Sequence, residues 1–186
     1  MDSGILNVVI FVAASGCFLA ISRKSLRNVR SHGFYRFFAW EAILALILIN
    51  AGVWFADPFS LPQIFSWLFL FVSLALLQQG VSRILATGKP NDERSDDTLL
   101  EFEKTTNLIT SGIYRYIRHP LYGSLLFLAW GAFLKELSWY SVCLVLAATL
   151  FLIATAKADE TECIRYFGIS YEEYMLKTKM FIPFIF

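Results

Sequence analysis

The stretch LPQIFSWLFLFVSLALLQQGVSRIL, residues 61–85, decides the fold class of this chain. It is almost free of charged side chains, and a helix of about 20 such residues crosses the hydrocarbon core of a bilayer. Further apolar runs occur at residues 5–21, 37–56, 121–134 and 138–156. The last two are separated only by a short polar break at Lys135 and Glu136. The sequence therefore predicts an all-α integral membrane protein with five transmembrane helices, of which the last two form a helical hairpin.

The composition argues against several other classes of protein. Hydrophobic residues make up 57% of the chain and are gathered into the long runs, which is not typical of a soluble domain. The net charge of +1 gives no reason to expect a nucleic-acid partner. Cys17, Cys143 and Cys163 form no C-x-x-C pair, so we expect free thiols, no disulfide framework and no metal site.

The basic residues predict the orientation of the helices. All of the 16 Lys and Arg residues except Lys135 lie between the first two runs, from the end of the third run to the start of the fourth, or after the fifth. Cytoplasmic segments of membrane proteins carry such an excess. We therefore expect the N-terminus outside, the C-terminal helical segment in the cytoplasm, and a first run that is retained rather than cleaved as a signal peptide.

The chain divides into two regions at the end of the third run. Residues 1–85 form three N-terminal transmembrane helices, and residues 86–186 hold the last two helices and the unusual polar segments. Residues 86–111 are polar and are expected to form a loop with one helical turn around residues 99–104. With the predicted orientation, the segments 86–120 and 157–183 face the same compartment.

One candidate site lies where the polar loop enters the fourth run. Arg118, His119 and Pro120 occupy this junction, and Pro120 suits the first position of a helix. The free N–H groups and the dipole of a helix start favour an anion, and Arg118 adds a positive charge. His119 and Tyr122 are three residues apart and can face one pocket. Alternatively, the arginines and tyrosines of this segment only anchor the helix at the headgroup level.

A second candidate cluster follows the fifth run, at Asp159, Glu160 and Glu162. These carboxylates are able to hold an ammonium group or ribose hydroxyls, or they are simply solvated at the membrane exit. Further along, Gly168 is expected to end one helix before another begins. Glu41 is a third candidate because an ionisable group within a span is costly and tends to be functional, although pairing with Arg36 is an equal alternative.

The two clusters together resemble a known family. Residues 111–122 are similar to the G-x-Y-x-x-x-R-H-P-x-Y signature of the isoprenylcysteine carboxyl methyltransferase and phospholipid methyltransferase group. Asp159-Glu160, followed by Phe167-Gly168, Tyr171, Tyr174 and Pro183, resembles the C-terminal pattern of the same group. The resemblance covers residues 106–186, in matching order and spacing.

This resemblance implies an integral membrane methyltransferase that uses S-adenosylmethionine and acts on a lipophilic small molecule or lipid. By matching position, it implies catalytic roles for Arg118, His119 and Glu160. It implies that the cofactor contacts a set of loop, helix-start and acidic residues: Thr106, Asn107, Leu108, Ile109, Tyr114, His119, Pro120, Leu121, Tyr122, Asp159 and Glu160.

Two positions depart from the pattern of that family. Asp159 stands where the family usually has Glu, and Thr155 stands where the eukaryotic carboxyl methyltransferases have an Arg that is thought to hold the substrate carboxylate. We therefore hypothesise an acceptor other than a prenylcysteine carboxylate. The competing interpretations are an NADPH-dependent membrane sterol or lipid reductase and a non-enzymatic membrane protein. Pro120 and the number of spans favour methyl transfer over reduction.

Overall fold

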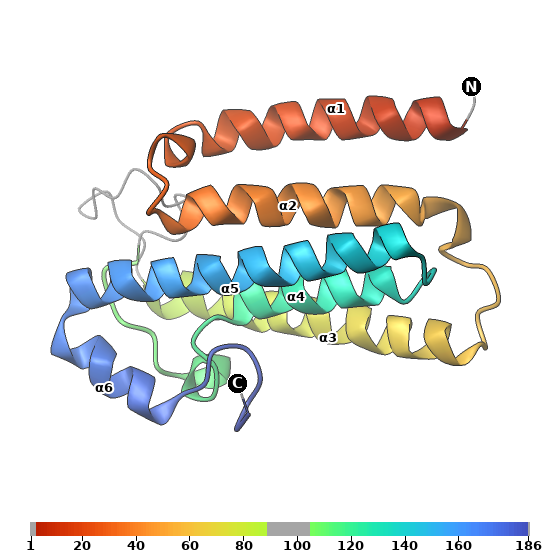
Figure 1. Cartoon of the computed structure of the whole chain (residues 1–186). Coiled ribbons are helices and arrows are strands. Elements are labelled where there is room, and N and C mark those ends of the chain that lie inside the picture. The colour runs from red at the N-terminus through yellow and green to blue at the C-terminus, as the bar shows by residue number, and fades with distance from the viewer. Residues whose placement is uncertain (1–2, 89–104, 186) are drawn as a thin grey trace.

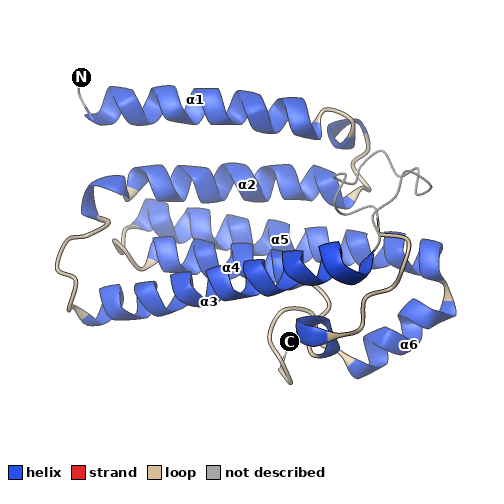
Figure 2. Cartoon of the chain, turned by 180° about the vertical axis from the view of Figure 1, so that it is seen from behind, coloured by secondary structure: helices blue, strands red, loops and turns tan. Residues whose placement is uncertain are grey.

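The computed structural model describes residues 3–88 and 105–185, which fold into helices (Figure 1). The α-helices of this part of the chain are α1 (Ser3–Ser22), α2 (His32–Ile49), α3 (Leu61–Arg83), α4 (Pro120–Phe133), α5 (Trp139–Phe167) and α6 (Ile169–Lys177). No β-strand occurs in these two ranges (Figure 2). An isolated β-bridge joins Ile117 to Lys179. The predicted all-helical class is confirmed. The helical turn expected around residues 99–104 lies outside the described residues.

Several helices have the length and composition of membrane spans. Within residues 3–88 and 105–185, four segments qualify, namely Gly4–Ser22, His32–Ile49, Leu61–Gly88 and Trp139–Phe167. The helix Pro120–Phe133 is also apolar but has only 14 residues. The described helices are therefore those of a multi-pass membrane protein.

The long helices lie side by side, with α1 on the outside against α2 and α6 at one end of the bundle (Figures 1 and 2). The centre is formed by small and branched side chains such as Ala39, Leu46, Ala148 and Leu152, none of which has any exposed surface. Small residues allow helix backbones to approach closely, which is how helices associate in lipid. The contact between α2 and α5 is built in this way.

The boundaries of two helices differ from the prediction. The predicted fifth span ends at residue 156, but α5 continues to Phe167. The acidic cluster therefore belongs to this helix and does not follow it, because nothing after residue 156 interrupts helical geometry before Gly168. The predicted break at Gly168 is present, with a positive φ of 61°. Helix α2 begins at His32, before the apolar run, because Ser31 caps it by accepting a hydrogen bond from the Phe34 N–H.

Hydrogen bonds between helices reinforce the packing. Ser66 donates to the carbonyl oxygen of Gly131 at 2.7 Å, and Ser73 donates to that of Ser124 at 2.7 Å, so α3 is joined to α4 at two levels. Glu41, the third candidate residue, accepts a hydrogen bond from Ser15 at 2.6 Å. This contact ties α1 to α2 within the spans.

Lys135, the one basic residue outside the basic segments, is buried in the turn between α4 and α5. Its ammonium donates to Gln63 Oε1 at 2.9 Å and lies 3.7 Å from the ring centroid of Trp67. A cation over an indole face is stabilised by the negative face of the ring. Lys135 therefore anchors this turn to the start of α3.

The close approach of α3 and α4 at Gly131 generates a stability prediction. A Cβ atom added there would lie 2.9 Å from the Leu70 side chain and 3.2 Å from the carbonyl oxygen of Ser66. We expect Gly131→Ala to destabilise the protein by about 1–3 kcal/mol, because an overfilled interface forces its neighbours apart. The measurement is thermal unfolding in detergent micelles. Gly16→Ala is the control, because a Cβ at Gly16 meets nothing within 4 Å. Equal melting temperatures in both variants would contradict the packing shown here.

Candidate functional site

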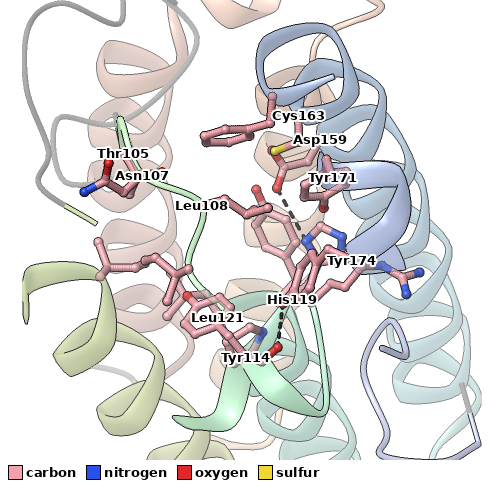
Figure 3. Close-up of a pocket in the computed structure, with 16 residues that line it drawn as sticks. Thr105, Asn107, Leu108, Tyr114, His119, Leu121, Asp159, Cys163, Tyr171 and Tyr174 are labelled. Atoms are coloured by element: carbon pink, nitrogen blue, oxygen red, sulfur yellow. Dashed lines mark hydrogen bonds and ion pairs between the residues drawn. The ribbon is translucent and has the colours of Figure 1, made fainter. Parts of the chain in front are cut away.

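A pocket opens at the end of the bundle where α4 begins, α5 ends and α6 folds back (Figure 3). Its empty space is about 700 Å³, part of it open to solvent, which is within the range of small-molecule sites. The lining combines residues from the loop, the helix starts and α5 to α6: Ile84, Thr105, Asn107, Leu108, Ile109, Tyr114, Arg118, His119, Pro120, Leu121, Tyr122, Asp159, Cys163, Phe167, Tyr171 and Tyr174.

Most of the predicted site residues line this pocket, and they include Arg118 and all the predicted cofactor contacts except Thr106 and Glu160. Thr106 belongs to the loop beside the pocket, where its backbone N–H donates to Gly88. Glu160 lies behind His119, on the far side of the imidazole from the pocket acid Asp159. The two predicted clusters are therefore brought together into one site.

His119 is held between two carboxylates. Its Nδ1 lies 3.4 Å from Asp159 Oδ2, and its Nε2 lies 3.3 Å from Glu160 Oε1. The ring is buried and stacks on Tyr122. Burial alone would lower the pKa of His119, but the hydrogen bonds and charges of Asp159 and Glu160 outweigh it and raise the pKa above 6.5. Both ring nitrogens can donate only when the imidazole is protonated, so this geometry fits an imidazolium.

Arg118 uses its guanidinium to join three parts of the chain. Its Nε and Nη2 contact Glu160 Oε1 at 2.8 and 2.7 Å, a charge-assisted pair from the start of α4 to α5. Its Nη1 donates to the carbonyl oxygens of Met175 and Thr178. All three guanidinium nitrogens thereby contact protein oxygens. The geometry fits a residue that holds the site together.

The backbone before α4 is fixed by the segment after α6. The Arg118 N–H donates to Lys179 at 2.8 Å, and the Lys179 N–H donates back to Tyr116 at 3.0 Å. The Tyr174 hydroxyl donates to the carbonyl oxygen of Tyr114 at 2.6 Å. Burial raises the pKa of Tyr174, so its hydroxyl stays protonated as this bond requires. The segment that carries the signature is thus clamped to α6 and the residues after it.

Cys163 and Phe167 line the pocket but were missed by the sequence analysis. Both lie on the face of α5 that carries Asp159, at intervals of four residues. The Cys163 thiol contacts Asp159 Oδ1 at 3.7 Å. Helical spacing from Asp159, within the helix that was expected to end at Gly168, was the signal that could have identified them.

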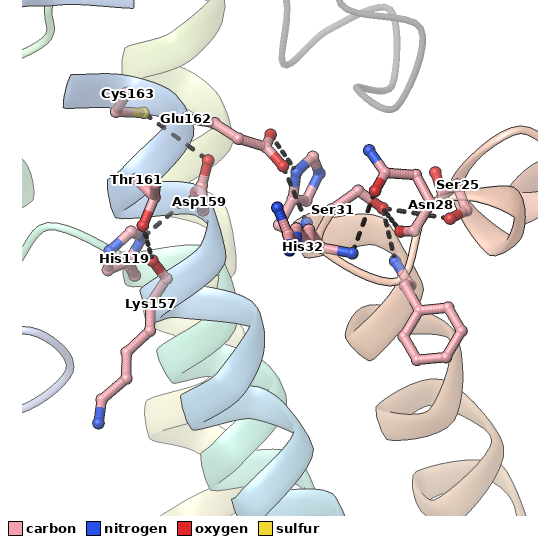
Figure 4. Close-up of polar contacts among 12 residues, drawn as sticks. Ser25, Asn28, Ser31, His32, His119, Lys157, Asp159, Thr161, Glu162 and Cys163 are labelled. Atoms are coloured by element: carbon pink, nitrogen blue, oxygen red, sulfur yellow. Dashed lines mark hydrogen bonds and ion pairs between the residues drawn. The ribbon is translucent and has the colours of Figure 1, made fainter. Parts of the chain in front are cut away.

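His32 and Glu162 form a second polar cluster beside the pocket (Figure 4). His32 Nδ1 lies 2.7 Å from Glu162 Oε2, and the His32 backbone N–H donates to Glu162 Oε1 at 3.0 Å. With Asp159 they offer three ligand atoms within 4.8 Å of one another, a set that could hold a metal ion. No signal in the sequence linked His32, at the start of the second span, to the acidic cluster.

The raised pKa of His119 predicts a pH-dependent stability. A group with a raised folded-state pKa stabilises the fold fully below its unfolded value of 6.5, and this contribution is lost as pH rises through the folded pKa. We therefore expect the stability advantage of the wild type over His119→Gln to be largest in acid and to shrink at alkaline pH. Thermal unfolding of both proteins across this pH range measures it. A constant difference would show that folding leaves the pKa of His119 unchanged, and a difference that grows with pH would show that folding lowers it; either result would contradict the charged pair described here.

Comparisons with known proteins show what this chain is similar to. Residues 94–179 match the model of the family described as phospholipid methyltransferase. A protein-S-isoprenylcysteine O-methyltransferase of Xenopus laevis is 35% identical over 81 residues, which is 42% of this chain and 27% of the relative. A probable protein-S-isoprenylcysteine O-methyltransferase of Oryza sativa subsp. indica is 31% identical over 121 residues, or 64% of this chain and 63% of the relative.

The chain thus spans less than two thirds of the length of these curated relatives. No solved structure matches it. The family match includes both walls of the pocket, from the polar loop through His119 and Asp159 to Lys179. The matches agree with the resemblance that the two motifs predict: residues 94–179 are similar to the phospholipid methyltransferase family, and the chain is similar over part of its length to proteins named isoprenylcysteine O-methyltransferases.

Proposed function

We propose that this chain is an integral membrane methyltransferase that transfers a methyl group from S-adenosylmethionine to a lipophilic acceptor. The observation that carries the proposal is the pocket lined by His119 and Asp159, whose other lining residues, except Ile84, also lie within the family match. An acceptor that partitions into the bilayer suits this location, because the pocket lies at the end of apolar helices and has apolar walls such as Ile84 and Leu121.

We further propose that α4 is a fifth crossing and that the pocket faces the cytoplasm. A helix of 14 residues is about 21 Å long, which is shorter than a hydrocarbon core of about 30 Å. The start of α4 would then lie below the headgroups, so the site would be reached from both the bilayer and the aqueous side. The basic segments support an N-terminus outside and a cytoplasmic C-terminus.

The residues of the pocket fit S-adenosylmethionine. The N-terminal turn of α4 suits the carboxylate of the methionine part, and Asp159 suits its ammonium group or the ribose hydroxyls. Once bound, this cofactor supplies a methyl group on a positively charged sulfur, ready for direct displacement. The protein's task is then to hold donor and acceptor in line and to keep water out.

His119, Arg118 and Glu160 act in this proposal by fixing the pocket wall. A protonated His119 between two carboxylates has no lone pair with which to accept a proton, and the Arg118 donors are occupied by protein groups. Asp159 is the carboxylate of this network that lines the pocket. If the acceptor is an ammonium, Asp159 is the group placed to receive its proton.

Cofactor binding is testable with S-adenosylhomocysteine. We expect the wild type to bind it in isothermal titration. His119→Gln and Glu160→Gln should bind more than tenfold more weakly, because both side chains fix the pocket wall and hydrogen bonds to charged groups contribute roughly 1.5–3 kcal/mol. Glu172→Gln, an exposed acid on α6, is the control and should bind like the wild type. Titration with NADPH tests the alternative of a membrane reductase, and tight NADPH binding without S-adenosylhomocysteine binding would reject the proposal.

The acceptor is proposed to be a lipophilic molecule other than a prenylcysteine carboxylate. Thr155 has no exposed surface and donates to the carbonyl oxygen of Phe151 at 2.7 Å, so it cannot hold a substrate. Arg118 does not replace the missing arginine, because its guanidinium contacts Glu160 and two backbone carbonyl groups.

An assay with radiolabelled S-adenosylmethionine compares a farnesylated cysteine analogue with phosphatidylethanolamine. We expect little methylation of the farnesylcysteine carboxylate, since the described part of the pocket offers no arginine free to neutralise it. Efficient methylation that survives Lys157→Ala would show that Thr155 is no obstacle and that the acceptor argument is wrong.

A further inference from the structure

The contact between His32 and Glu162 joins the motif-free N-terminal half of the chain to the acidic end of α5 (Figure 4). Both carboxylate oxygens of Glu162 are used, one by the His32 ring and one by the His32 backbone N–H. The His32 side chain is fully buried, and the Glu162 side chain is 16% exposed. Such a two-point contact fixes the direction of the carboxylate as well as its distance.

The start of α2 is built to receive this carboxylate. Ser31 caps the helix and donates to the carbonyl oxygens of Ser25 and Asn28, so the loop before α2 is folded tightly against it. The N-terminus of a helix attracts negative charge through its dipole and its free N–H groups. Glu162 therefore binds at the capped N-terminus of α2, where contacts within residues 25–34 fix the backbone.

The end of α5 depends on polar contacts for its position. Among residues 157–163 only Glu160 is buried. Apolar packing therefore does little to fix the position of these helical turns. Glu160 and Glu162 are two residues apart, which separates them by about 200° around the helix axis. Arg118 holds the first and His32 holds the second, on opposite sides of the same turn. Asp159 and Cys163, which line the pocket, are carried by this doubly held turn.

We propose that His32 is a positioning residue for the cofactor pocket: through Glu162 it fixes the rotation of α5 that directs Asp159 into the pocket. This inference rests on the proposed function for the identity of the ligand. It adds to the site a residue that lies outside the region of the family match, residues 94–179. The N-terminal helices then contribute to binding as well as to membrane insertion.

The two nitrogens of the His32 ring have different surroundings, which allows a pair of substitutions that keep or remove the contact with Glu162. Nδ1 contacts Glu162, whereas Nε2 is buried and has no hydrogen-bond partner among the described residues. Asparagine places an N–H donor where histidine has Nδ1 and lacks the rest of the ring. His32→Asn should therefore keep the contact, and His32→Leu should remove it while the side chain stays comparably bulky.

The experiment measures the affinity for S-adenosylhomocysteine by isothermal titration, with melting temperatures recorded without ligand. We expect His32→Leu to weaken binding about tenfold, as loss of a hydrogen bond to a charged group predicts, and His32→Asn to stay much closer to the wild type. In a Glu162→Leu background, His32→Leu should cause no further loss. Gly131→Ala, which disturbs the distant contact of α3 with α4, serves as the control for general destabilisation.

Several outcomes would overturn the proposal. Unchanged affinity in His32→Leu is one, because it would mean that His32 has no role in ligand binding. An equal loss of affinity in Gly131→Ala at the same melting temperature is another, because it would mean that His32→Leu acts only through general destabilisation. Affinity of the wild type that is lost on treatment with EDTA is a third. It would mean that a metal ion bridges His32, Asp159 and Glu162 in place of the hydrogen bonds.

A wild type that binds no S-adenosylhomocysteine would reject the proposed function, and a second readout then tests His32 without ligand. In a Cys17→Ser, Cys143→Ser background, Cys163 is the remaining thiol of the chain. His32→Leu should raise its rate of modification by a water-soluble thiol reagent several-fold, and His32→Asn should not. Equal rates in the two variants would show that His32 does not fix this turn.

Discussion

The buried ion pair between Arg118 and Glu160 is the contact on which the candidate site depends. It joins the start of α4 to α5, and the same guanidinium reaches the residues that follow α6. Removing Glu160 would leave the Arg118 guanidinium, whose side chain is only 10% exposed, without its carboxylate partner, and breaking a fully buried pair in this way costs roughly 3–5 kcal/mol. With a protonated His119, the cluster of Arg118, His119, Asp159 and Glu160 has two positive and two negative groups. Each charge is thereby balanced within the site.

The two adjacent acids have different surroundings because α5 continues through them. Successive residues of a helix point in directions about 100° apart, so Asp159 faces the pocket while Glu160 faces Arg118. The side chain that is shorter than in the family pattern is the one that meets the pocket. The change from Glu to Asp at position 159 therefore affects the space available to a ligand and leaves the ion pair of Glu160 with Arg118 untouched.

The sequence predicted much of this arrangement. The features that it did not predict depend on contacts between residues far apart in the chain. Apolar runs predicted the helices, and the signature around His119 predicted which residues meet. The length of the apolar run did not show that the fifth span and the helix expected to end at Gly168 are one continuous helix, in which charged residues are paired with Arg118 and His32. The contact of His32 with Glu162 joins residues 130 apart, and no local pattern encodes such a pairing.

The clamp between the start of α4 and the segment after α6 also sets the order in which the molecule is assembled during synthesis. Arg118 and its partner Thr178 are 60 residues apart, and ribosomes add roughly 5–20 residues per second, so several seconds separate their appearance. During that interval Arg118 lacks the carbonyl groups of Met175 and Thr178. A nascent chain that already contains α4 and α5 therefore still lacks the contacts that complete the pocket.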